Sequence, residues 1–177
     1  MTSIKHLLGF VIFCLFLCQP PVVAATEAGG GYARQLWGST DLLQYEMFVR
    51  EPLPYKTILA DTSLVSSVVE LGIGIIRESQ VEHSEVGKVS VMPELVLKPY
   101  DRIHYLVGLG TGFMAGETKF TKHDLGGSFF LAAKLGLRLL IGEGWGLEYI
   151  YYHQSNAGIY ENNASLNMLQ VAIFFTF

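Results

Sequence analysis

The sequence predicts an all-β fold, an eight-stranded antiparallel transmembrane β-barrel of the outer membrane. Three observations lead to this prediction. Several segments of about a dozen residues alternate apolar and polar side chains with period two, which indicates strands rather than helices. An export signal stands at the start of the chain, and the last residue is the aromatic Phe177. The length of 177 residues suits a single domain.

The first residues read as a secretory signal. A positive start is followed by an apolar run at 7–18, which is short for a membrane span, and small residues up to Ala25 offer a cleavage site. We therefore expect a signal peptide at residues 1–25, which is removed, and a single barrel domain at residues 26–177. A lipoprotein with Cys18 lipidated is the weaker alternative, because bulky residues precede that cysteine.

Both cysteines of the chain, Cys14 and Cys18, lie inside this signal. The exported domain would then hold no thiol, which excludes disulfides and metal sites built on thiolates. The net charge of −4 and the lack of a basic patch with interleaved aromatic residues argue against nucleic acid as a partner. No apolar run of about 18 residues follows the signal, so no transmembrane helix is expected.

Eight strands are expected, the smallest even number that such barrels use. Counted backwards from the C-terminus, they span 166–177, 145–156, 129–141, 103–115, 88–99, 66–78, 42–50 and 31–38. The connections 142–144 and 100–102 are short, as periplasmic turns are, whereas 79–87 and 116–128 are longer, as outer loops are. The connection 51–65 is long where a short turn is expected, which leaves the limits of the first two strands open.

Each strand has one apolar face and one face of glycine and charge. From Phe129 to Ile141 the odd positions are all apolar, whereas the even positions include Lys134 and Arg138. This pattern suits a barrel with lipid outside and a narrow polar interior. A soluble periplasmic sandwich that binds lipid is the alternative, because its core would also take one apolar face of each strand. The charged side chains expected to pair inside the barrel are Glu70, Glu94, Glu148, Lys98, Lys134 and Arg138.

The segment His-Gln-Ser-Asn-Ala-Gly at 153–158 places polar side chains on an apolar face. His153 and Ser155 are both odd, so they lie next to each other on the outward face, near the outer end of their strand. Polar groups in lipid are unfavourable unless they have partners or a task, and a serine needs a neighbouring base to become a nucleophile. The alternative is a strand that simply leaves the hydrocarbon and becomes a polar loop.

This segment, from His153 to Ile159, resembles the His-x-Ser-Asn-Ala signature of the PagL family, the lipid A 3-O-deacylases. The resemblance extends more loosely over the mature chain, to the eight-strand length and the final aromatic residue. It implies an outer-membrane esterase that removes the acyl chain ester-linked at position 3 of the lipid A glucosamine. In this resemblance Ser155 matches the nucleophile and His153 the general base, and the oxyanion-stabilising region matches Asn156 and the backbone N–H of Gly158.

The chain departs from the family at the third catalytic position, where an acidic residue on the final strand orients the histidine. The matching residue is Asn167, whose odd number places it beside His153 on the adjacent strand. An asparagine can accept a hydrogen bond from a ring N–H and fix the tautomer, but it has no charge to stabilise an imidazolium. A slower enzyme would follow. Glu161, in the connecting loop, is the rival for this orienting role.

The resemblance implies no metal and no cofactor, and it makes lipid A, or lipopolysaccharide, of the outer leaflet the partner of an integral protein of the bacterial outer membrane. A calcium-dependent barrel phospholipase is not supported, because no carboxylate cluster is visible that would hold the ion. The alternative function is a non-catalytic structural or adhesive barrel, with Asn167 marking lost chemistry. The preferred acyl length and the formation of a homodimer stay open.

Overall fold

The computed structural model describes residues 26–38, 40–53, 64–79, 81 and 84–177. The expected signal peptide and both cysteines lie outside the described residues. Within the described part of the chain, no helix is long and apolar enough to cross a membrane.

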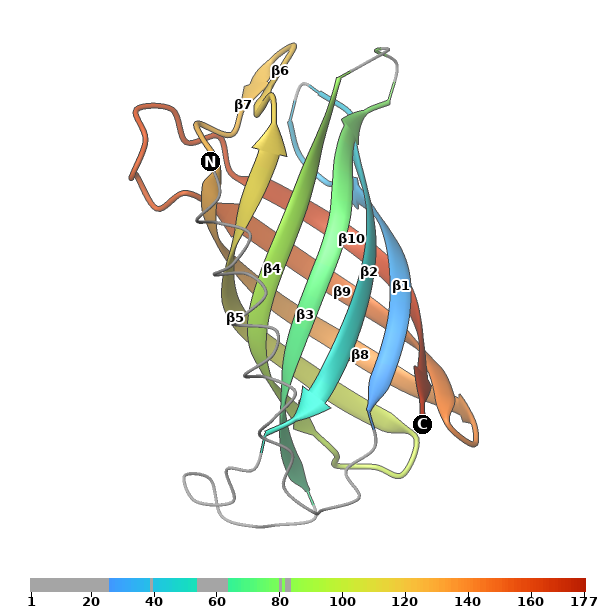
Figure 1. The fold of residues 1–177 in the computed structure, drawn as a ribbon. Helices are drawn as coiled ribbons and strands as arrows, with labels where there is room; N and C mark the ends of the chain where they lie inside the picture. The colour runs from blue at the N-terminus through green and yellow to red at the C-terminus, as the bar shows by residue number, and fades with distance from the viewer. Residues whose placement is uncertain (1–25, 39, 54–63, 80, 82–83) are drawn as a thin grey trace, which may run out of the picture.

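Eight long strands close into an antiparallel barrel, in which neighbours in the sequence are neighbours in the sheet (Figure 1). Pairing of the first strand with the last completes the ring. The predicted eight-stranded barrel is therefore confirmed, and the sandwich alternative is wrong. The strands are β1 Glu27–Gln35, β2 Leu42–Pro52, β3 Val65–Glu78, β4 Glu85–Leu97, β5 Ile103–Gly116, β8 Phe129–Gly142, β9 Trp145–Ser155 and β10 Leu166–Thr176.

Seven of these strands begin and end within three residues of their predicted limits, and β1 is the exception. It was expected at 31–38 but spans Glu27–Gln35. Its first half contains Gly29 and two further glycines, which hide any alternation because glycine has no side chain. Glycine is required at position 29, since a Cβ there would collide with the ring of Phe48. Close packing inside the barrel thus explains the strand that the sequence pattern missed.

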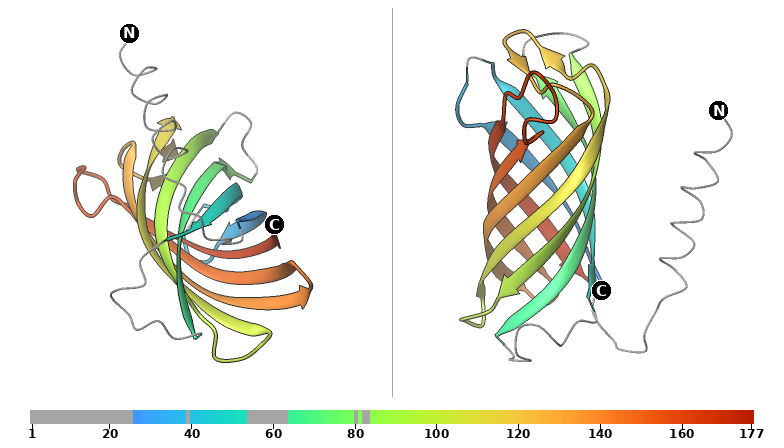
Figure 2. Two further views of the ribbon diagram at one scale, coloured as in Figure 1. Left: turned by 60° about the horizontal axis from the view of Figure 1, so that its bottom comes forward. Right: turned by 90° about the vertical axis from the view of Figure 1, so that its left-hand side faces the viewer.

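The two ends of the barrel differ in the length of their connections (Figure 2). At one end short turns join β4 to β5 and β8 to β9, and the C-terminus lies there too. At the other end lie the longer connections, and the one between β5 and β8 carries a hairpin of β6 (Lys119–Phe120) and β7 (His123–Asp124). The β2 to β3 connection is the exception to this difference, because it is long, as the sequence indicated, although it lies at the end with the short turns; residues 54–63 of it are outside the described part.

Apolar side chains cover the outer surface of the barrel. Met47 of β2 and Leu109 of β5 are each 69% exposed, and Ile73 of β3 is 61% exposed. An apolar surface of this kind on every side is unfavourable in water but suits the hydrocarbon of a bilayer. The outward face of the strands is therefore the lipid-facing surface.

A cluster of buried charges fills the half of the interior nearer the short turns, and Arg50 of β2 is at its centre. The Arg50 side chain is completely buried, and its guanidinium lies 2.7 Å from Glu70, 2.8 Å from Glu94 and 2.7 Å from Glu148. Those three carboxylates come from β3, β4 and β9, so one guanidinium connects strands on opposite sides of the barrel. Buried charges are tolerated only when paired in this way.

Three further cations complete this cluster. Lys134 contacts Glu70, Lys88 lies 3.2 Å from Glu46, and Arg138 lies 2.8 Å from Glu148. The pairing expected for Lys134 and Arg138 is thus present. The same expectation was wrong for Lys98, because that residue lies just past the end of β4 and makes no ion pair with a described residue. Arg50, Glu46 and Lys88 were not anticipated.

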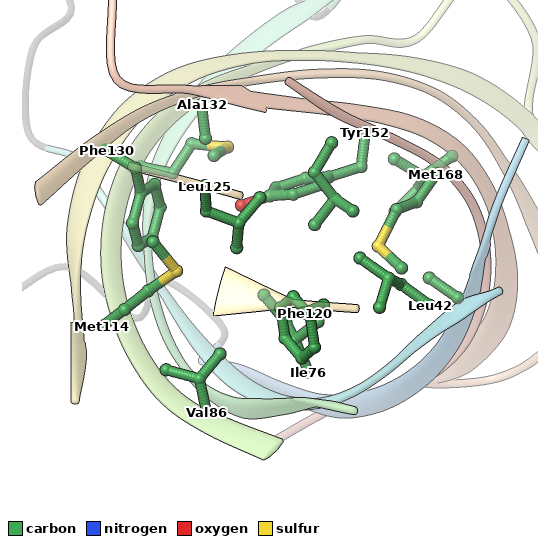
Figure 3. Close-up of a cluster of buried hydrophobic side chains, with 14 residues drawn as sticks. Leu42, Ile76, Val86, Met114, Phe120, Leu125, Phe130, Ala132, Tyr152 and Met168 are labelled. Atoms are coloured by element: carbon green, nitrogen blue, oxygen red, sulfur yellow. The ribbon is translucent and has the colours of Figure 1, made fainter. Parts of the chain in front are cut away.

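An apolar cluster fills the interior towards the other end (Figure 3). Phe120 and Leu125 come from the β5 to β8 connection, and each is less than 5% exposed. They lie inside the ring of strands, against side chains such as Ile76 and Tyr152. The hairpin connection therefore contributes to the core, and both levels of the interior are packed with side chains.

The outward orientation can be tested at Leu109, which lies in the middle of β5. We expect Leu109→Arg to lower the folding free energy in lipid by about 2–4 kcal/mol, because an unpaired charge would meet the bilayer midplane. Leu109→Met, which keeps an apolar side chain, should fold normally. The measurement is urea unfolding in liposomes, followed by the gel shift between heated and unheated samples. Equal stability of the two variants would mean that this face does not meet lipid.

The charge cluster can be tested at Arg50. We expect Arg50→Met to destabilise the barrel by about 3–5 kcal/mol, because several carboxylates would stay buried without their cation. Gln44→Met is a matched control on the same strand and face, because the side chain of Gln44 makes a single long hydrogen bond, of 3.4 Å, to the described part of the chain. Urea unfolding in liposomes compares the two. Similar losses would show that Arg50 is not the organising charge.

Candidate active site

The polar segment of the sequence lies at the outer end of β9, where the strand meets the longer loops. Tyr152, Gln154 and Asn156 are each 2% exposed or less, so they point into the barrel. His153 and Ser155 alternate with them and face outwards, half-buried, as the alternation predicts. The two side chains thus share the lipid-facing surface.

Asn167 lies directly opposite His153, on the adjacent antiparallel strand β10. The Nδ1 atom of His153 is 2.8 Å from the Oδ1 atom of Asn167. The hydroxyl of Tyr151 donates to the same Oδ1 atom, over 2.7 Å. Because an amide oxygen only accepts hydrogen bonds, a neutral imidazole in this contact carries its proton on Nδ1, which leaves a lone pair on Nε2. This tautomer is the one that can accept a proton from a serine.

Glu161, the rival for the orienting position, does not reach the histidine. It is exposed in the connection between β9 and β10, and no described hydrogen bond joins it to His153. Of the two candidates, the structure brings Asn167 alone into contact with the imidazole.

Ser155 lies two residues beyond His153 on the same face of the strand. The structure shows no hydrogen bond between these two side chains, whose Cα atoms are separated by about 6.6 Å in an extended strand. Hydrogen bonds of this kind are often long before substrate binds and shorten in the complex. The nucleophile and the base are therefore neighbours without being in contact.

The β8 side of the site is apolar. Ala133 lies opposite His153, and Leu131 lies opposite Ser155. Ala133 has only a methyl group beside the imidazole, and Leu131 and Leu135 are 42% and 59% exposed. A small polar patch with an apolar border on the lipid-facing surface suits an ester whose acyl chain lies in the bilayer.

Asn156 begins the turn that follows Ser155, and its side chain joins the β5 to β8 and β9 to β10 connections. The side-chain amide is buried, and its Nδ2 atom donates to the carbonyls of Leu125 (3.1 Å) and Asn162 (2.6 Å). Its Oδ1 atom accepts from the backbone N–H of Gly158, over 2.9 Å, and its own backbone N–H donates to Asn163. The two donors expected to stabilise an oxyanion are therefore engaged inside the protein.

Ala157, between these two residues, has an unusual backbone. Its φ is +53°, a region that residues other than glycine rarely adopt, and Gly158 follows at +79°. The N–H of Ala157 donates to no residue in the described part of the chain. Strain of this kind is often retained at functional sites, so this N–H becomes a third candidate donor beside the serine.

Tyr151 was missed in the sequence because a tyrosine on an outward face reads as a membrane-interface residue. Its odd number did place it on the face of His153, and diagonal neighbours across antiparallel strands are within reach of aromatic side chains. No metal centre is added by the structure. Among the described residues, no three His, Cys, Asp or Glu side chains lie together in a way that would hold an ion.

Comparison with known proteins points to one family. The family model described as lipid A 3-O-deacylase (PagL) matches residues 24–176. No curated protein matches the sequence. Among solved structures, the chain is similar to the crystal structure of the outer membrane enzyme PagL, with a TM-score of 0.63 and 18% identity over 86% of this chain and 99% of that one.

Two other solved barrels show how widely this fold is shared. The surface protein NspA of Neisseria is 8% identical with a TM-score of 0.58, over 87% of this chain and 97% of that one. The outer membrane protein Ail of Yersinia pestis is 12% identical with a TM-score of 0.52, over 87% and 99%. At such identities the structural likeness shows the fold alone.

The family assignment therefore depends on the family model, which covers nearly all of the described chain. Family and fold together imply an integral outer-membrane protein that acts on lipid A. The chain belongs to the PagL family of lipid A 3-O-deacylases and is an enzyme of that class.

Proposed function

We propose that the protein is a serine esterase that hydrolyses the 3-O-linked acyl chain of lipid A, with Ser155 as nucleophile and His153 as general base. The observation that supports this proposal best is the 2.8 Å contact between His153 Nδ1 and Asn167 Oδ1. It leaves Nε2 of His153 unprotonated on the face that also carries Ser155. A polar loop without a function would not require a histidine held in one tautomer on a lipid-facing surface.

The reaction proceeds in two steps through an acyl-enzyme. Nε2 of His153 takes the proton of the Ser155 hydroxyl as the oxygen attacks the ester carbonyl. The tetrahedral intermediate collapses, the bond to the sugar oxygen breaks, and His153 returns the proton to that leaving alcohol. In the second step His153 activates a water molecule, which attacks the acyl-serine and releases a 3-hydroxy fatty acid. No step requires a metal or a cofactor.

The turn at 156–158 is the proposed oxyanion-stabilising region. Backbone amides fixed before the reaction stabilise a developing oxyanion without reorganisation. The N–H of Gly158 would first have to exchange its bond to Asn156, whereas the N–H of Ala157 has no partner among the described residues. Ala157 is therefore added to the donors inferred from the sequence, and Asn156 acts by holding the turn in place.

The position of the site defines how the substrate arrives. His153 and Ser155 face the lipid near the loop end of β9, so a lipid A molecule of the outer leaflet reaches them by lateral diffusion. Its acyl chain can lie along the apolar border made by Leu131 and Leu135. The sequence leaves the formation of a homodimer open, and chemical crosslinking in intact membranes would test it.

The proposal is tested by mass spectrometry of lipid A from cells with and without the protein. We expect the unmodified protein to remove one 3-hydroxyacyl chain, at position 3, and Ser155→Ala and His153→Ala each to abolish most of this cleavage. The double variant should be little worse than either single one, because residues that act as a unit are not additive. Ser67→Ala is the matched control. Ser67 is an outward-facing serine near the start of β3, at the opposite end of the barrel from Ser155.

All variants must first show the gel shift of a folded barrel. Full activity of Ser155→Ala would overturn the nucleophile assignment. Unchanged lipid A in cells that hold the folded, unmodified protein would favour the non-catalytic structural or adhesive barrel instead.

A second prediction concerns the residue that replaces the family's acid. We expect Asn167→Asp to keep or raise the activity, because a carboxylate accepts the same hydrogen bond and also stabilises the imidazolium formed during attack. Asn167→Leu should lower kcat by at least about tenfold, since the histidine loses its fixed tautomer. Glu161→Gln should change little. Release of 3-hydroxy fatty acid by the purified variants is the assay. A strong loss of activity in Glu161→Gln, with nearly normal activity in Asn167→Leu, would assign the orienting role to Glu161.

A further inference from the structure

Tyr151 is a polar residue at the candidate site. The proposed ester hydrolysis assigns no role to it. It lies on β9, two residues before His153 and on the same outward face. Its hydroxyl donates to Oδ1 of Asn167 over 2.7 Å, and the same oxygen is 2.8 Å from Nδ1 of His153. One amide oxygen thus accepts hydrogen bonds from both side chains.

The Asn167 amide must be oriented with its oxygen towards His153, whereas a carboxylate would need no such orientation. A carboxylate offers an oxygen at either end, but an asparagine offers an oxygen at one end and an NH₂ group at the other. If the Asn167 amide turned over, its nitrogen would donate to Nδ1 of His153. The imidazole proton would then move to Nε2, and His153 would have no lone pair to take the serine proton.

The hydroxyl of Tyr151 favours the productive orientation. In the hydrocarbon, a hydroxyl hydrogen without an acceptor is unfavourable, and Oδ1 of Asn167 is its acceptor here. With the amide turned over, that hydrogen would have no acceptor among the described residues. The only described side-chain contact on the NH₂ group is a long one, 3.4 Å to the hydroxyl of Ser165, so the nitrogen end alone holds the amide weakly.

The tyrosine ring is itself held in place. Its neighbour is Trp37 from the connection between β1 and β2, with ring centroids 6.2 Å apart and an edge-on arrangement. Tyr151 also lies diagonally across from Asn167, since its direct partner on β10 is Leu169. The hydroxyl is therefore directed at the amide oxygen by packing on one side and by strand register on the other.

We propose that Tyr151 is a positioning residue, whose hydroxyl orients the Asn167 amide and thereby keeps the imidazole proton of His153 on Nδ1. Its effect on catalysis rests on the proposed function, whereas its effect on the tautomer does not.

The kinetic test compares Tyr151→Phe in two backgrounds. In the unmodified protein, we expect kcat to fall about three- to tenfold with little change in KM, the range that one net hydrogen bond supplies. In the Asn167→Asp background the same change should lower kcat less than about twofold, because a carboxylate needs no orientation. Equal losses in both backgrounds, or a rise in KM in both, would show that Tyr151 packs against its neighbours or contacts the substrate, and would overturn the proposal.

Nitrogen-15 NMR of histidine-labelled protein in detergent provides a readout without activity. The His153 signals, assigned by their absence in His153→Ala, should show the proton on Nδ1 in the unmodified protein. In Tyr151→Phe a fraction with the proton on Nε2 should appear. Tyr149→Phe is the matched control, because this tyrosine is on the same strand and face, 53% exposed, and makes no hydrogen bond to a described side chain.

A tautomer that does not change in Tyr151→Phe overturns the proposal, whatever the kinetics show. Full activity of Ser155→Ala, in contrast, would remove the proposed serine mechanism and leave the NMR result valid. The two failures are therefore distinguishable.

Discussion

The closed ladder of backbone hydrogen bonds is the constraint on which the rest of the structure depends. In hydrocarbon every backbone group must be paired, and pairing β1 with β10 leaves no open edge. Closure then divides the side chains of each strand between lipid and interior. On the lipid side a polar residue is an exception that requires a reason. His153, Ser155 and Asn167 form a cluster of such exceptions, and this is why a short polar segment points to the candidate site in a chain of alternating strands.

Closure of the barrel also determines which side chains fill the interior. Towards the short turns, buried carboxylates are held by cations centred on Arg50. Towards the loops, the interior is apolar and includes Phe120 and Leu125 from the hairpin connection. Leu125 links this core to the site, because its carbonyl accepts a hydrogen bond from the buried amide of Asn156. The turn beside Ser155 is thus positioned by the packed interior, even though the site itself faces lipid.

Period-two alternation predicted the outward face of the candidate site and seven of the eight strands, and together with the export signal and the terminal aromatic residue it predicted the barrel. It failed for β1, where glycines such as Gly29 leave no side chains to alternate. It predicted the pairing of Lys134 and Arg138 but missed Arg50, because pairing depends on which strands face each other across the lumen, and Arg50 meets residues 20 and 98 positions away. The role of Tyr151 was also hidden, since a diagonal contact requires the register of β9 and β10. Sequence resemblance named Asn156 and Gly158, but it could not show that their donors are already engaged.

The proposed replacement of the family's acid by Asn167 has a physical consequence for a candidate site that faces lipid. A carboxylate there would be removed from water, which is unfavourable unless the charge is fully paired. An amide avoids that penalty, and its oxygen still accepts a hydrogen bond from the protonated nitrogen of His153. It loses the charge that stabilises an imidazolium, and it can present the wrong end to the histidine. The first loss concerns the reaction alone. The second loss concerns the orientation of the amide. The hydroxyl of Tyr151, whose ring packs against Trp37, lies where it can keep the amide in the productive orientation. A neutral orienting residue and a second hydroxyl donor therefore form one unit, in which the tyrosine supplies the orientation that a symmetric carboxylate would have had by itself.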